Sequence, residues 1–154
     1  DKIHIKKYIV PIGSKNIFPY FAEDNIADIN SILLNNQSDN LFFKIDIEGS
    51  EYRILNQLIE NESRLSGLVI EFHDCDLHKD KIKNFIENFK LQLVHIHVNN
   101  ADFIDPDGFP RALELTFSPP KFNKENLNNH KKFPTLIDQP NNLLSKDYII
   151  EFYD

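Results

Sequence analysis

An α/β fold with a mostly parallel sheet and an antiparallel last strand is predicted by the order of the apolar segments. Between residues 41 and 98, short runs rich in β-branched residues alternate with amphipathic helical segments, and strand–helix–strand units of this kind give parallel strands. The final run follows a turn with no helix before it, which favours an antiparallel return. Because 154 residues, 41% of them hydrophobic, can bury one core, we expect a single domain over residues 1–154. Its core is expected in residues 3–118, followed by a loop-rich C-terminal extension in 119–154.

The first elements are a strand and a helix. Residues Ile3 to Val10 (IHIKKYIV) are typical of a short strand that ends at turn-forming residues. From Asn25 to Leu34, isoleucine and leucine recur at helical spacing behind Asp24, a residue type that caps helix N-termini well. We therefore expect a helix that starts behind Asp24 and ends at the Asn-rich segment 35–38.

A strand and a helix follow from residue 41. The run Leu41 to Ile47 (LFFKIDI) is nearly continuous in apolar residues and too short for a typical helix, so it predicts a strand buried on both faces. A helix is expected to start near Gly49 and Ser50, with an apolar stripe at Ile54, Leu55, Leu58 and Ile59. Glu51 falls in its first turn, where the helix dipole favours an anion.

The remaining elements continue the alternation. Leu68 to Phe72 predicts a second buried strand, and His78 to Phe89 an amphipathic helix. Leu91 to Val98 predicts a third strand, a turn over residues 105–108 follows, and Ala112 to Phe117 predicts the last strand. The short apolar stretch Tyr148 to Tyr153 is expected either to add an edge strand or to pack on the surface.

Composition excludes several classes of protein. The formal net charge of −7, with scattered Lys and Arg residues, makes binding to nucleic acid unfavourable. The longest apolar runs are far shorter than the roughly 20 residues that span a bilayer. A single cysteine, Cys75, indicates a reducing compartment without a structural zinc, and the cytoplasm fits this best. The chain opens on Asp1 without a signal-peptide pattern, so we expect its natural start to lie upstream.

Polar residues at the ends of two predicted strands indicate a ligand site. One apolar run is interrupted by Lys44 and Asp46, and Glu48 follows at its end with the same alternation. At the end of the next run, the polar residues Glu71 and His73 alternate with apolar ones. Ligands of open α/β sheets bind outside the carboxyl ends of the strands. Asp46, Glu48, Glu71 and His73 are therefore the candidate site residues.

Structural explanations for these residues stay open. Lys44 can pair with Glu71 or Asp46 across the sheet, and Glu48 and Glu51 can serve as charges at a helix terminus. His95 and His97 share one strand face, but without a third ligand at a telling spacing a packed or solvent-facing role is favoured over a metal pair. Cys75 lies between Asp74 and Asp76, an acidic setting that disfavours a catalytic thiolate.

One motif resembles a known family. The string Lys44–Leu55 (KIDIEGSEYRIL) is similar to the signature of FkbM-type S-adenosylmethionine-dependent methyltransferases, which read K-I/V-D-I/V-E-G-x-E before an apolar helix. Ile70–His73 (IEFH) resembles the strand end that follows in that family, and Arg111–Phe117 (RALELTF) its final strand. The resemblance covers about residues 3–118. It implies the Rossmann-like sheet of class I methyltransferases, with the last strand antiparallel.

The resemblance also implies where the chain stands in that domain. The KIDIEG strand would be the fourth, so the N-terminal strands, the Gly-rich cofactor turn and the acidic residue that holds the ribose would precede residue 1. The glycines at 13, 49, 67 and 108 form no GxG. The resemblance therefore implies a partial methyltransferase domain, which we expect to be inactive by itself.

The function implied is O-methylation of a sugar or another small polar metabolite, with S-adenosylmethionine as cofactor. His73 is the first candidate for the base that takes the hydroxyl proton, because its ordinary pKa is nearest neutrality, and Glu71 is the second. Asp46 and Glu48 would position the acceptor or face the sulfonium of the cofactor. Spacing alone supports no metal site, including an ion held by Asp46 with Glu71. The alternative is a non-catalytic binding or assembly module that keeps the fold. A metal-dependent hydrolase is a further enzyme hypothesis, but this sequence lacks the several His ligands that such sites usually carry.

Overall fold

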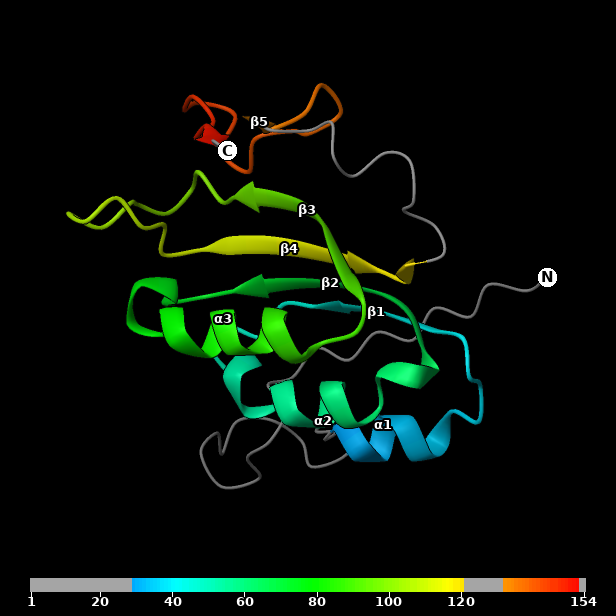
Figure 1. Cartoon of the computed structure of the whole chain (residues 1–154). Helices are drawn as coiled ribbons and strands as arrows, with labels where there is room; N and C mark the ends of the chain where they lie inside the picture. Colours follow the sequence, from blue (N-terminus) through cyan, green and yellow to red (C-terminus); the bar gives the residue numbers. More distant parts are fainter. Residues whose placement is uncertain (1–28, 121–131, 153–154) are drawn as a thin grey trace, which may run out of the picture. The chain divides into compact units, whose positions relative to one another are not determined.

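The computed structural model describes residues 29–120 and 132–152 (Figure 1). The chain divides into two units, Asp1–Gln37 and Ser38–Asp154. In the first unit, helix α1 spans Ile29–Asn35 and buries Ile29, Ile32 and Leu33, which recur at helical spacing. The predicted helix over 25–34 is confirmed from residue 29. Its start, its expected cap and the strand predicted over 3–10 lie outside the described residues.

The second unit contains strands that alternate with short helices, as predicted. Its elements in chain order are β1 (Leu41–Ile45), η2 (Glu51–Arg53), α2 (Leu55–Glu60), η3 (Glu62–Arg64), β2 (Leu65–Phe72), η4 (Cys75–Leu77), α3 (Lys79–Asn88), β3 (Gln92–Val98), β4 (Leu113–Ser118), β5 (Lys132–Phe133) and β6 (Ile150–Glu151), where η denotes a 3₁₀ helix. Each strand predicted between residues 41 and 117 is present with bounds that differ by a few residues.

Strands β1 to β4 form one mixed sheet in the order β1-β2-β4-β3. β1 and β2 are parallel, and β4 is antiparallel to both of its neighbours, β2 and β3. The fold is therefore α/β, and the prediction of an antiparallel last strand is confirmed. β2 and β3, which α3 connects, run in the same direction but are not neighbours, because β4 folds back from β3 into the position between them.

The apolar core lies between the sheet and helices α2 and α3, which cover the same face of the sheet (Figure 1). Phe85 of α3 packs with its ring centroid 6.2 Å from that of Phe72 in β2 and 5.5 Å from that of Phe117 in β4. Ile70 and Leu115 face each other in the β2–β4 register and are fully buried. Alternate residues of the two strands thus form a continuous apolar surface that the helices close.

Strand β1 differs from its prediction. It ends at Ile45 rather than Ile47, and one of its faces is not buried, because Phe42 is 62% exposed and Lys44 is also exposed. Among the described strands, β1 pairs only with β2 and forms an edge of the sheet. The side chain of Lys44 makes no ion pair with Asp46 or Glu71 in the described structure, so the predicted cross-sheet pairing is not formed.

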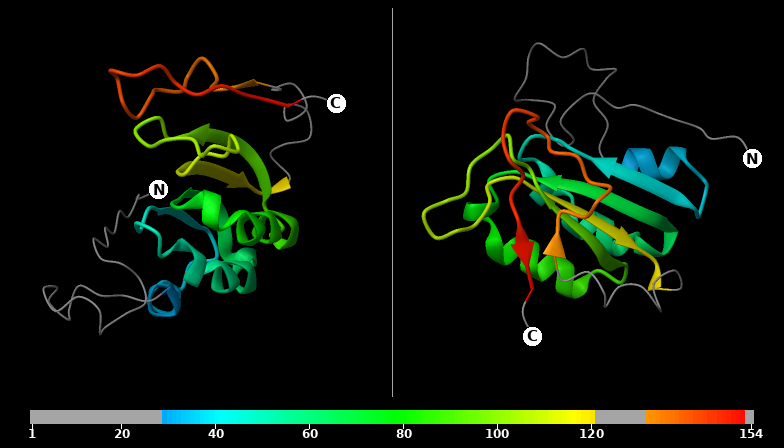
Figure 2. Two further views of the ribbon diagram at one scale, coloured as in Figure 1. Left: turned by 90° about the vertical axis from the view of Figure 1, so that its left-hand side faces the viewer. Right: turned by 90° about the horizontal axis from the view of Figure 1, so that it is seen from above.

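The opposite face of the sheet is polar and carries residues 132–152. Glu71, Glu114 and His97 lie side by side across β2, β4 and β3. The left-hand view of Figure 2 shows the C-terminal residues next to β3, where Asp147 contacts His97 and Asp138 contacts His95. The predicted extra strand over 148–153 is present only as β6, which pairs with β5 rather than with the main sheet.

Candidate functional site

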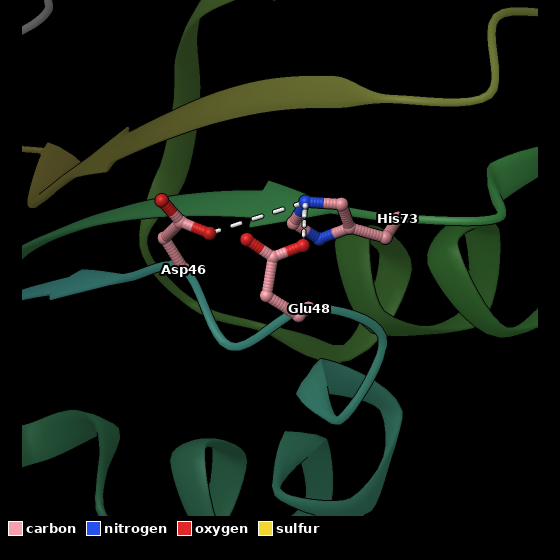
Figure 3. A group of neighbouring side chains, drawn as sticks. All are labelled: Asp46, Glu48 and His73. Atoms are coloured by element: carbon pink, nitrogen blue, oxygen red, sulfur yellow. Dashed lines mark ion pairs between the residues drawn. The ribbon is translucent and has the colours of Figure 1, made fainter. Parts of the chain in front are cut away.

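The four predicted site residues converge at the carboxyl ends of β1 and β2. Asp46 directly follows β1, whose last residue pairs with Ile70, and Glu71 and His73 lie at the end of β2. Nε2 of His73 lies 3.9 Å from a carboxylate oxygen of Asp46 and 3.5 Å from one of Glu48, as Figure 3 shows. The same nitrogen lies 3.9 Å from Glu71 Oε1. The expectation that these residues share one place in the fold is confirmed.

A tight turn brings Glu48 back toward His73. Glu48 has φ of 53° and Gly49 has φ of 91°, so two consecutive residues adopt left-handed backbone conformations. Glycine adopts such values without steric cost, whereas other residues rarely do. The backbone N–H of Ser50 donates to the carbonyl of Ile47 and closes the turn. Gly49 therefore lies in the turn that leads from β1 to the helical residues expected to start near Gly49 and Ser50.

Glu51 organises this turn from inside the protein. Its side chain is 0% exposed. The backbone N–H of Ile47 donates to its Oε1 over 2.9 Å and that of Gly49 to its Oε2 over 3.0 Å. Oε1 also lies 3.2 Å from Nδ1 of His73. A buried carboxylate is stable only with such partners, so Glu51 fixes both the turn and the ring of His73, a role beyond the helix-terminus charge that the sequence suggested.

Two further contacts hold the residues around His73. The hydroxyl of Tyr52 donates to the carbonyl oxygen of His73 over 2.6 Å. The side-chain amide of Asn99 donates to Glu71 Oε1 over 2.7 Å. Asn99 was not among the residues predicted from the sequence, although it directly follows β3, which runs in the same direction as β2, so the strand-end rule also applies to it.

The carboxylates shift the proton affinities of their neighbours. The hydrogen bond to Glu51 outweighs burial and, with the charges of Glu71 and Glu48, raises the pKa of His73 to about 9. Burial is the main reason that the pKa of Glu71 is raised, and the charges of Asp46 and Glu114 add to it, against the opposing hydrogen bond from Asn99. The site therefore combines one imidazole with an excess of negative charge.

The four residues line an open cavity of about 450 Å³. The other lining residues come from the β3–β4 connection, the start of β4 and the C-terminal segment: Asn99, Ala101, Asp102, Ala112 and Asn141. This volume suits a small molecule. Most of the lining is polar, so the cavity is suited to a ligand that carries hydroxyl groups or positive charge.

The other residues considered from the sequence lie away from this cavity. Cys75 is buried, and burial raises the pKa of its thiol to about 12, which agrees with the prediction that it is not a nucleophile. His95 Nε2 lies 3.0 Å from Asp138, and His97 lies between Glu114 and Asp147. Both histidines thus pack against acidic side chains, the role that the sequence favoured over a metal pair.

No protein-family model matches the chain, and comparisons with curated proteins and with solved structures also gave no match. Within residues 29–120 and 132–152, no helix has the length and apolar composition needed to cross a membrane.

Proposed function

We propose that the chain is the C-terminal part of an FkbM-type methyltransferase domain that transfers a methyl group from S-adenosylmethionine to a hydroxyl of a sugar or another small polar metabolite. The observation that carries this proposal is the position of the family-like motif. Its Asp46 and Glu48 meet Glu71 and His73 at one cavity, at the carboxyl ends of two parallel neighbouring strands. Open α/β sheets bind their ligands at this position.

The topology and the charge of the cavity support the same proposal. The antiparallel β4 agrees with the last strand that the resemblance implies. The carboxylates of Asp46, Glu48 and Glu71 around the cavity fit the positive sulfonium side of the methyl donor. When bound, S-adenosylmethionine supplies an electrophilic methyl group. The anchors for its amino-acid end and ribose are expected upstream of residue 1.

The residues of the cavity have distinct roles in this proposal. Both ring nitrogens of His73 already face carboxylates, Glu51 on one side and Glu48 on the other. Glu71 accepts a hydrogen bond from Asn99 and keeps further lone pairs, so it is the better placed base for the hydroxyl proton. Asp46, Glu48 and His73 then orient the acceptor. Orientation supplies much of the acceleration in such a transfer.

The test is methyl transfer by the full-length gene product. It is supplied with S-adenosylmethionine that carries a labelled methyl group and with a panel of sugars and polyols. We expect label in at least one acceptor, and a rate about 10²- to 10⁴-fold lower for Glu71→Gln, because a general base contributes roughly this factor. Glu87→Gln, on the exposed side of α3, is the matched control and should retain the wild-type rate.

Two results would contradict the proposal. Absence of transfer to every acceptor by a folded protein would favour the alternative, a binding or assembly module that keeps the fold without catalysis. Equal rates for Glu71→Gln and wild type would remove Glu71 from the chemistry.

A further inference from the structure

Three side chains at the mouth of the cavity form a mixed set of metal-ligating atoms. One ligand atom each from Asp46, Glu48 and His73 lies within 4.8 Å of the others (Figure 3). The set combines an imidazole nitrogen with two carboxylates. Proteins hold divalent cations with ligands of these types.

The ring of His73 is oriented as metal-binding histidines are. One nitrogen, Nδ1, faces the buried carboxylate of Glu51, which leaves Nε2 directed at Asp46 and Glu48. A histidine that binds a metal almost always donates its other N–H to a carboxylate, carbonyl or water behind it. Because Glu51 is fully buried and also fixes the turn after β1, this arrangement is built into the fold and does not depend on surface side chains.

The distances allow a cation with small side-chain movements. Nε2 lies 3.5 Å from Glu48 and 3.9 Å from Asp46. Ligand atoms at about 2.1 Å from a common ion are roughly 3 Å apart, so each carboxylate must approach Nε2 by less than about 1 Å. The two carboxylates, which lie within 4.8 Å of each other, must also move together. The side chains of Asp46 and Glu48 are 44% and 83% exposed and can rotate, whereas that of His73 is 20% exposed and held by Glu51.

The chemistry of the ligands selects the type of ion. Carboxylate and water ligands suit Mn²⁺, and the imidazole ligand favours a transition metal such as Mn²⁺ over Mg²⁺, whereas structural Zn²⁺ sites are usually built from Cys and His. Glu71 lies 3.9 Å from the same nitrogen and adds negative charge. Three protein ligands leave positions for water or for the oxygens of a bound molecule.

We propose that Asp46, Glu48 and His73 bind one divalent cation of the Mn²⁺ type at the mouth of this cavity. The site depends on these residues alone and is independent of the methyltransferase proposal.

The experiment is a titration of the 154-residue chain with Mn²⁺ alone, followed by the electron paramagnetic resonance signal of free Mn²⁺. We expect one bound ion per chain with micromolar affinity. Glu48→Gln, a substitution at an exposed side chain that should leave folding intact, should weaken binding at least tenfold. Glu87→Gln removes another exposed carboxylate elsewhere in the chain and should bind as wild type does.

Three outcomes would overturn the proposal. They are no binding below millimolar Mn²⁺, binding that Glu48→Gln leaves unchanged, and binding that Glu87→Gln weakens as much as Glu48→Gln does. The last would indicate diffuse attraction to an acidic protein rather than a site. The titration contains neither S-adenosylmethionine nor a methyl acceptor, so absence of Mn²⁺ binding would not contradict the methyltransferase proposal. Absence of methyl transfer would likewise not contradict the cation site.

Discussion

At the scale of single residues, the local sequence KIDIEGSE determines the geometry of the site. Asp46 and Glu48 could be predicted as site residues because they end an apolar run, and the structure brings both to His73. The role of Glu51 could not be predicted, because its hydrogen-bond partners are backbone N–H groups of a turn, and the sequence does not reveal the shape of that turn. The left-handed conformation of Glu48 next to Gly49 is the local feature that makes this turn.

Substitution of Gly49 tests that turn. An added Cβ would meet nothing closer than 3.8 Å, so the cost of Gly49→Val comes from its φ of +91° and not from a clash. A β-branched residue is strained in that conformation, and we expect a loss of about 1–3 kcal/mol in the free energy of unfolding. Asn tolerates positive φ better, so Gly49→Asn should lose clearly less. Urea unfolding of both variants measures the difference, and an unchanged stability for Gly49→Val would show that the turn is not constrained.

At the scale of elements, the strands and helices of residues 41–118 follow from their apolar patterns, but the strand order does not. The helix-free connection between β3 and β4 favours their pairing, but it does not determine on which side of β3 strand β4 lies. In the observed order, Phe117 of β4 packs against Phe85 and Phe89 of the α3 region. The exposed face of β1 was also not predictable, since the run LFFKI looks the same in an edge strand and a central one.

The contact of the C-terminal segment with β3 was beyond prediction from sequence, because its partners are 50 residues apart. His97 Nδ1 lies 3.2 Å from Glu114 and Nε2 lies 3.0 Å from Asp147, and His95 nearby pairs with Asp138. Burial lowers the pKa of His97, but the hydrogen bonds and charges of Asp147 and Glu114 outweigh it and raise the pKa. The contacts with Asp147 and Glu114 therefore favour the protonated form of the His97 ring.

This pairing predicts a pH dependence of stability. Because the pKa of His97 is higher in the folded than in the unfolded chain, its contribution is complete below the unfolded pKa of about 6.5 and is lost as pH rises through the folded value. The difference in free energy of unfolding between wild type and His97→Gln should therefore shrink as pH is raised from 6 toward 9. Urea unfolding at several pH values measures it, and a difference independent of pH would show that His97 does not carry the charge assigned to it.

At the scale of the whole molecule, the proposed function divides the ligand site between this chain and residues upstream of it. The ends of β1 and β2 supply acidic groups to a cavity of about 450 Å³. The resemblance to the FkbM family implies that the backbone turn and the acidic residue that anchor the donor precede residue 1. Too few fixed contacts would then remain in the 154-residue chain to offset the ordering cost of binding the donor.

Titration calorimetry with S-adenosylmethionine tests the methyltransferase account most directly. The comparison is between the 154-residue chain and a chain extended upstream through the expected glycine-rich turn. We expect the extended chain to bind the donor with a Kd in the micromolar range, about −8 kcal/mol, and the 154-residue chain to bind weakly or not at all. Tight binding by the 154-residue chain would contradict the division of the site between the two parts, and absence of binding by the extended chain would contradict the methyltransferase assignment itself.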